Sequence, residues 1–161
     1  MKDDDFERVY ADHAQGLFSF LVYRTGDRAL AEDMLADAFE RALRARHRFD
    51  RRRASEKTWV YAIALNCLRD HQRRTAAEER ALERTATSTT HEQDHPLDRI
   101  DKRDSVRRAL EILTAEEREA IALRYGADLT VPEIARVTGQ PLTTVEGRVY
   151  RALRRLRNEL A

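Results

Sequence analysis

The sequence predicts an all-α protein with two small helical domains joined by a flexible linker, the C-terminal one a helix-turn-helix. Turn-forming residues are scarce, since the 161 residues include only five Gly and three Pro. Apolar side chains recur at helical spacing along most of the chain. One interval, residues 85–96, has no apolar period and is rich in Thr and Ser. Together these features indicate two helical bodies separated by a polar connection.

The first domain is expected to span residues 1–75 and to begin with two helices. The first helix should end near Gly26, and Asp27 should cap the second. The second, from Arg28 to Arg46, has an apolar stripe on one face, and its other face carries Glu32, Asp33, Asp37, Glu40 and Arg41.

A third helix should follow the basic stretch at residues 50–53, with Ser55 as its N-cap. It contains Trp59 and Asn66, whose spacing of seven residues puts them on nearly one face. Trp59 taken alone is more typical of a core residue than of a stacking platform. We expect the helix to reach Arg73 and Arg74 and the linker to occupy residues 76–103, of which residues 78–84 could still be helical.

The linker contains His91 and His95, spaced as two zinc ligands on a helix can be. Their surroundings are polar, and the chain has a single cysteine, Cys67, which excludes both an internal disulfide and a cysteine-rich zinc site. Nothing resembles a nucleophile with its base or a glycine loop for phosphates. We therefore expect no catalytic centre, no cofactor and no metal, and hence no enzyme.

The second domain, residues 104–161, shows three capping boxes, each a Thr followed three residues later by Glu: Thr114 with Glu117, Thr130 with Glu133, and Thr143 with Glu146. Gly139 should end the helix that starts near Val131, and a longer helix should follow after Pro141. A short helix, a tight glycine turn and a longer helix form a helix-turn-helix. The long helix should turn Val145, Val149, Leu153, Leu156 and Leu160 inward.

Charge is sorted along the chain although the net charge is only +1. Residues 51–77 carry seven basic groups against two acidic ones, and Thr144 to Ala161 carries five Arg against two Glu. A polyanion contacted at two places explains this pattern, with solvated helix faces as the alternative. The N-terminus has no signal-peptide pattern, and no apolar run is long enough to insert into a membrane, so we expect a cytoplasmic protein.

Three stretches resemble the extracytoplasmic-function (ECF, group IV) family of RNA polymerase sigma factors. The first is Ala31-Glu-Asp-Met-Leu-Ala-Asp-Ala-Phe39. The second is Lys57-Thr-Trp-Val-Tyr-Ala-Ile-Ala-Leu-Asn66, followed by Asp70-His-Gln-Arg-Arg74. The third is Leu123-Arg-Tyr125, then Thr130-Val-Pro-Glu-Ile-Ala135 and Thr144-Val-Glu-Gly-Arg-Val-Tyr-Arg-Ala152. Their order and spacing match the family over most of the chain outside the linker.

The resemblance implies a factor that brings core RNA polymerase to promoter DNA. The N-terminal domain would be sigma domain two, which docks on the clamp helices of the largest subunit and opens the −10 element. The C-terminal domain would be sigma domain four, which reads the −35 element and meets the flap of the second-largest subunit. An anti-sigma factor is an additional candidate partner.

The family's functional positions map onto this sequence as follows. The polymerase-binding residues would be Asp33, Ala36, Asp37 and Glu40, with Ala36-Asp37 standing where the family usually has Gln-Glu. The −10 residues would be Phe49, Arg51, Arg52, Arg53, Lys57, Trp59, Asn66, Arg73 and Arg74. The −35 residues would be Arg124, Thr144, Glu146, Arg148, Tyr150 and Arg151.

Glu146 departs from the family, which commonly has Lys or Arg at that position. Its capping box offers a structural reason for an acid there, and a carboxylate could also accept a hydrogen bond from a cytosine amine. The alternative for the whole chain is a stand-alone helix-turn-helix regulator, which would bind its operator tightly without polymerase.

Overall fold

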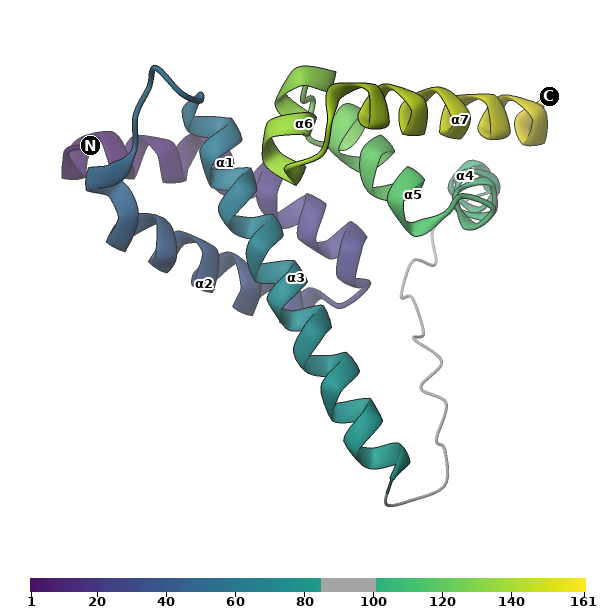
Figure 1. The fold of residues 1–161 in the computed structure, drawn as a ribbon, viewed down its shortest axis with the longest axis horizontal. Coiled ribbons are helices and arrows are strands. Elements are labelled where there is room, and N and C mark those ends of the chain that lie inside the picture. The colour runs from purple at the N-terminus through teal and green to yellow at the C-terminus, as the bar shows by residue number, and fades with distance from the viewer. Residues whose placement is uncertain (85–100) are drawn as a thin grey trace. The chain divides into compact units, whose positions relative to one another are not determined.

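The chain divides into two compact units, Met1–His95 and Pro96–Ala161. The computed structural model describes residues 1–84 and 101–161, and every element within those residues is a helix (Figure 1). The all-α prediction is therefore confirmed. Within the same residues, no helix carries an apolar stretch long enough to cross a bilayer.

The first unit contains three long helices, α1 (Asp3–Thr25), α2 (Arg28–Ala45) and α3 (Glu56–Glu83), with the short 3₁₀ turn η1 (Arg46–Arg48) after α2. Their ends agree with the sequence signals. Gly26 ends α1 in the left-handed conformation, with φ 67°, and its N–H donates to the carbonyl of Val22. The Asp27 side chain accepts from the Leu30 amide, and Ser55 caps α3 by accepting from the Thr58 amide.

The core of the first unit is formed where the three helices face one another. Its fully buried side chains come from all three: Val9, Leu17, Leu21, Ala31, Ala38, Ala42, Val60, Ala64 and Leu65. Aromatic rings close its sides, with Phe20 edge-on to Tyr61 at 5.8 Å between centroids and Tyr10 edge-on to Phe39 at 4.7 Å. Burial raises the pKa of Tyr61 to about 12.

Helix α3 continues to Glu83, eight residues into the interval 76–103 that we expected to be linker. This agrees with the helical alternative for residues 78–84. Residues 76–83 are Ala, Glu, Arg and Leu, which hold a helix by intrinsic propensity even though all of them are exposed. A helix that buries no stripe shows no apolar period, so periodicity alone leaves its extent open. The rest of the predicted linker up to residue 100, with His91 and His95, lies outside the described residues.

The second unit contains α4 (Asp101–Glu111), α5 (Ala115–Ile121), a π-helical turn η2 (Ala122–Gly126), α6 (Val131–Thr138) and α7 (Leu142–Leu160). The capping boxes of Thr114 with Glu117 and Thr130 with Glu133 both form, as predicted. Gly139 ends α6 with φ 68°. Helix α6, its glycine turn and α7 form the expected helix-turn-helix.

The third predicted capping box, Thr143 with Glu146, is wrong. Pro141 occupies the N-cap in an extended conformation, and the cap makes no side-chain hydrogen bond. Helix α7 begins at Leu142, which puts Thr143 inside the first turn and Glu146 past the unbonded amides that a box would satisfy. The amides of Thr144 and Val145 instead donate to the carbonyl of Pro141.

The core of the second unit joins α5, η2 and α6 to one face of α7. Leu123, Leu129, Ile134 and Val145 are nearly inaccessible to solvent, and Leu113, Ile121 and Ala152 form a cluster covered by Leu110, Leu153 and Leu156. Four of the five residues predicted to face inward on α7 do so. Leu160, the last residue of the helix, does not face inward and is 54% exposed.

Replacing Gly139 with Ala should destabilise only the second unit. A side chain in the left-handed conformation costs about 1–2 kcal/mol, so the unfolding midpoint followed by far-UV circular dichroism should fall. The matched control is Gly126→Ala, where φ is not positive and an added β-carbon meets nothing within 4 Å. Trp59, the only tryptophan, reports on the first unit, so its fluorescence midpoint should not move. Equal midpoints for Gly139→Ala and wild type would contradict the prediction.

Candidate functional site

The predicted acidic surface lies on one face of α2. Asp33, Ala36 and Glu40 are exposed and Asp37 is half-buried. Their spacing of three, four and seven residues aligns them along about two turns of the helix. The structure therefore groups these four positions on a single strip of surface.

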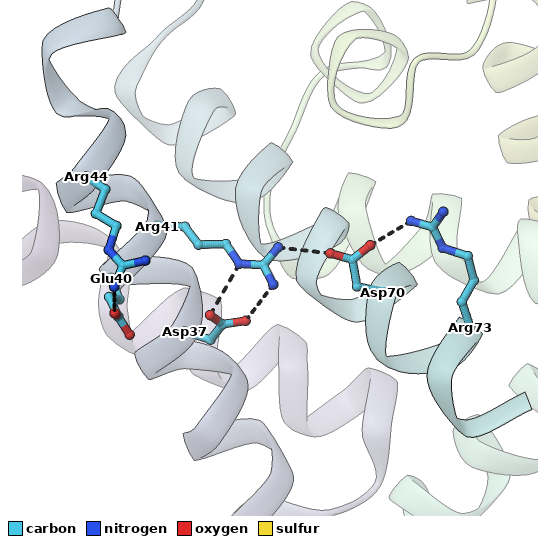
Figure 2. A network of polar contacts seen from close by, with 6 residues as sticks. All are labelled: Asp37, Glu40, Arg41, Arg44, Asp70 and Arg73. Atoms are coloured by element: carbon cyan, nitrogen blue, oxygen red, sulfur yellow. Dashed lines mark hydrogen bonds and ion pairs between the residues drawn. The ribbon is translucent and has the colours of Figure 1, made fainter. Parts of the chain in front are cut away.

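Asp37 is held by an arginine that also reaches the neighbouring helix (Figure 2). The Arg41 guanidinium bonds both oxygens of Asp37, with Nε to Oδ1 at 3.2 Å and Nη2 to Oδ2 at 3.0 Å. Its Nη1 donates to Oδ2 of Asp70 on α3 at 2.9 Å, and Arg73 donates to the other Asp70 oxygen at 2.6 Å. The acidic strip is therefore tied through Arg41 to α3, the helix of Asn66, Arg73 and Arg74.

Acidic and basic side chains alternate in this network, and their contacts shift the pKa values of its members. The hydrogen bond from Arg41 lowers the pKa of the Asp70 carboxyl below its usual value, and the same contact raises the pKa of Arg41. Cys67 is buried beside them, and burial together with Asp37 raises the pKa of its thiol to about 11. Asp37 and Arg41 are four residues apart, which predicts their pairing, but the link to Asp70 spans 29 residues and has no local signal.

The loop between α2 and α3 brings two of the predicted −10 residues into contact. The rings of Phe49 and Trp59 lie 4.9 Å apart between centroids at an interplanar angle of 45°. Both residues are half-buried. Trp59 is thus neither a sealed core residue nor a free platform, because Phe49 covers part of it. Asn66 is exposed two turns further along the same face of α3.

Glu56, at the start of α3, organises the basic part of this loop. Its carboxylate accepts two hydrogen bonds from Arg8 of α1, at 2.9 and 3.0 Å, and one from Arg51 at 3.0 Å. These contacts lower the pKa of Glu56, with the Arg8 bond as the main cause. The three side chains, with Ala54 and Ser55, line an open hollow of about 400 Å³. Sequence reasoning missed Arg8, which is 48 residues from Glu56.

The other basic residues predicted for −10 DNA are spread over the loop and α3. Arg52 and Arg53 are exposed at the turn, where the Asp50 side chain accepts from the Arg52 amide and lies 3.9 Å from Arg53. Lys57 is half-buried in the first turn of α3, whereas Arg74 is exposed almost five turns further along. The structure therefore collects the residues from 49 to 59 and leaves Arg73 and Arg74 apart from them on the same helix.

The predicted −35 residues lie mostly on the N-terminal half of α7. Thr144, Arg148 and Arg151 share one face by their spacing, and Glu146 and Tyr150 share the adjacent one. Glu146, Tyr150 and Arg151 are exposed, Tyr150 by 67%. The remaining residue, Arg124, lies in the π-helical turn, where it covers the Tyr125 ring and donates to the Leu129 carbonyl at 3.4 Å.

The sequence alone did not predict that Glu117, next to this surface, contacts α7. Glu117, expected only as a capping residue, is 3% exposed. One of its carboxylate oxygens lies 3.9 Å from Nε of Arg151, and the other lies 3.5 Å from Nη1 of Arg155. The capping motif predicted only the role of Glu117 at the start of α5. Its two arginine partners are brought close by the packing of α7 against α5, and no local sequence pattern predicts that contact.

The comparisons with known proteins match both units. Residues 9–78 match the model of Sigma-70 region 2, and residues 103–156 match that of Sigma-70, region 4. The ECF RNA polymerase sigma factor SigL of Mycobacterium tuberculosis is 31% identical over 155 residues, which cover 92% of this chain and 85% of SigL. RNA polymerase sigma factor YlaC of Bacillus subtilis is 29% identical over 98% of this chain and 92% of its own. The chain spans 59% of the longer relative BldN of Streptomyces coelicolor, with 28% identity.

Two solved structures share the fold. The sigma factor RpoE of Bartonella quintana, in complex with the anti-sigma factor NepR, aligns with a TM-score of 0.77 and 24% identity over 97% of this chain and 96% of its own. CnrH, in complex with the cytosolic domain of CnrY, gives 0.69 and 24% over 99% and 89%. The two family regions occur in the expected order on two separate helical units, and a relative above 30% identity covers nearly the whole chain. This protein therefore belongs to the ECF family of RNA polymerase sigma factors.

Proposed function

We propose that this protein binds core RNA polymerase and directs promoter-specific transcription initiation, acting in the cytoplasm and catalysing no reaction of its own. The observation that carries the proposal is the presence of both sigma regions, each on its own compact unit with its own arginine-rich surface. Residues 1–75 are assigned to polymerase docking and −10 opening. Residues 104–161 are assigned to −35 recognition, with residues 76–103 as the connector.

The acidic strip of α2 is the proposed docking surface for the clamp helices. Its exposed carboxylates, Asp33 and Glu40, suit a basic partner surface, and complementary charge guides such encounters. The negative charge of Asp37 is already partly neutralised by Arg41 before any partner binds. Asp37 then serves to hold Arg41 in place as much as to supply charge.

The segment from Phe49 to Trp59, with Asn66 further along α3, is the proposed −10 surface. Opening a duplex requires an aromatic or polar place for an unpaired base and cations for the freed strand. The Phe49–Trp59 pair supplies an aromatic wall, and Arg51, Arg52 and Arg53 supply the charge. In this arrangement Glu56 holds Arg51 ready at the edge of the hollow.

The N-terminal half of α7 is the proposed −35 reader, as in other helix-turn-helix proteins that place this helix in the major groove. Arg148 and Arg151 are the candidates for guanine edges, while Thr144 and Arg124 are candidates for phosphate contacts. The solved structure of RpoE contains the anti-sigma factor NepR, and that of CnrH contains the cytosolic domain of CnrY. We extend this to the present chain and propose an anti-sigma factor as a third kind of partner, beside polymerase and promoter DNA.

The runner-up function, a stand-alone helix-turn-helix regulator, is separated from this one by its need for polymerase. Run-off transcription with core polymerase on a genomic fragment library should yield discrete promoters only when the protein is added. The free protein should bind the same fragments weakly and with strong dependence on salt, because it neutralises few phosphates by itself. Nanomolar, sequence-specific binding by the free protein at physiological salt would favour the regulator.

Reversing the charge of the acidic strip should weaken polymerase binding. We expect Asp33→Lys, combined with Asp37→Lys, to reduce affinity for core polymerase about tenfold or more, because like charges would then face each other. Asp33→Lys alone leaves the Arg41 network intact, so it separates docking from the support of α2. Glu7→Lys, the same change at an exposed acid of α1, is the control. A fluorescence titration that shows equal affinity for the control and the Asp33 variants would refute the docking surface.

The failure of its capping box leaves Glu146 without that structural role, and its exposed carboxylate stands on the proposed reading face. Glu146→Gln should therefore change the preferred base at one −35 position in a randomised promoter library, since an amide offers a different donor and acceptor pattern to a base edge. Thermal stability should not change. Glu159→Gln, in the last turn of α7, controls for the loss of one charge. An unchanged base preference would rule out base reading by Glu146.

A further inference from the structure

Glu117 is buried more deeply than a capping residue needs to be. The equivalent residue of the next helix, Glu133, closes the same kind of box while remaining partly exposed. Glu117 is 3% exposed, and a buried carboxylate is costly unless cations or hydrogen bonds compensate it. Its compensation comes from two sources, the capping bonds within α5 and the arginines of α7.

The two carboxylate oxygens of Glu117 have separate partners. Oε2 accepts from the Thr114 amide at 3.2 Å and lies 3.5 Å from Nη1 of Arg155, which also donates to the Ile112 carbonyl at 3.5 Å. Oε1 faces Nε of Arg151 at 3.9 Å. Thr114 thus fixes the carboxylate, and the fixed carboxylate attracts one edge of the Arg151 guanidinium.

The other edge of Arg151 lies over Gly147, one turn earlier on α7. A β-carbon built on Gly147 would stand 3.0 Å from Nη1 of Arg151 and 3.7 Å from both Cζ and Nη2. Side chains on a helix lean toward its N-terminus, and here the lack of a side chain at position 147 lets the guanidinium lie close to the helix. The Arg151 side chain remains 57% exposed. Its terminal nitrogens are therefore directed toward the turns of α7 that enter a major groove.

We propose that Glu117 and Gly147 are positioning residues for promoter recognition, which together orient Arg151 for a bidentate contact with a guanine in the −35 element. A planar guanidinium can pair with a carboxylate on its Nε side while its other nitrogens meet O6 and N7 of guanine. Glu117 supplies the attraction, and Gly147 supplies the space. The inference rests on the proposed function, because it assigns the orientation of a side chain on the proposed −35 surface.

The test uses holoenzyme reconstituted from core polymerase and the full chain, on a promoter recovered by run-off transcription and randomised at its −35 positions. Arg151→Ala should relax selectivity at one position by about 5- to 150-fold. Glu117→Gln keeps a side chain that can still close the capping box but removes the charge, and it should relax selectivity at the same position by about fivefold. In the Arg151→Ala background, Glu117→Gln should have no further effect. Glu133→Gln, the same change in the box of α6, should leave selectivity intact.

Gly147→Ala keeps the Glu117 charge and favours the helix. It therefore tests the proposal even if circular dichroism shows that Glu117→Gln does not fold. The added methyl would stand 3.0 Å from Nη1, so the guanidinium would have to shift from its place over Gly147, and selectivity should relax at the position that Arg151 reads. Unchanged selectivity in this variant overturns the proposal. An effect of Glu117→Gln that is equal for all bases, or that adds to the effect of Arg151→Ala, also overturns it. The same holds if Arg151→Ala causes no base-specific loss of selectivity. If the wild-type holoenzyme selects no promoter at all, the proposed function itself fails, before any variant is compared.

Discussion

Small buried residues determine how closely the helices of the first unit approach one another. Ala31, Ala38 and Ala42 on α2 and Ala64 on α3 are fully buried, and small buried residues let neighbouring helices approach closely. Helices α2 and α3 pack against each other, and Arg41, which bonds Asp37 on its own helix, also reaches Asp70 on α3. The packing of these two helices therefore joins the acidic strip to the helix that carries Trp59. A larger residue at any of these alanines would force the helices apart or into strain.

A common pattern appears on each proposed binding surface, where an arginine is oriented by a carboxylate before any partner arrives. Arg41 is held by Asp37 and Asp70, Arg51 by Glu56, and Arg151 by Glu117. A long side chain loses conformational freedom when it binds, and prior contact with a carboxylate removes part of that loss. The carboxylates also lower the net positive charge, which limits indiscriminate binding to nucleic acid. Such surfaces favour recognition that needs a second anchoring point, as a factor dependent on polymerase would have.

The fold could be predicted largely from local signals, because helix ends depend on a few residues. Gly26, Ser55, Thr130 and Gly139 end or start their helices as expected. The Thr143 box failed because Pro141 had already started the helix, and a motif does not reveal which of two competing caps is used. The contacts that shape the proposed sites, such as Arg8 with Glu56 and Glu117 with Arg151, join residues far apart in the sequence. They follow from packing, and no spacing rule anticipates them.

The eight helical residues at the end of α3 determine the direction in which the chain leaves this helix. Each helical residue advances the chain by about 1.5 Å and also turns it by about 100° around the helix axis. Deleting one residue between 76 and 83 would swing the exit from α3 by more than a quarter turn while hardly changing its reach. Deleting about seven, close to two whole turns, would restore the heading. A change in the length of this helix therefore changes the direction in which the chain leaves it, whereas a change in the length of an unstructured tether would alter only the distance that the tether can span.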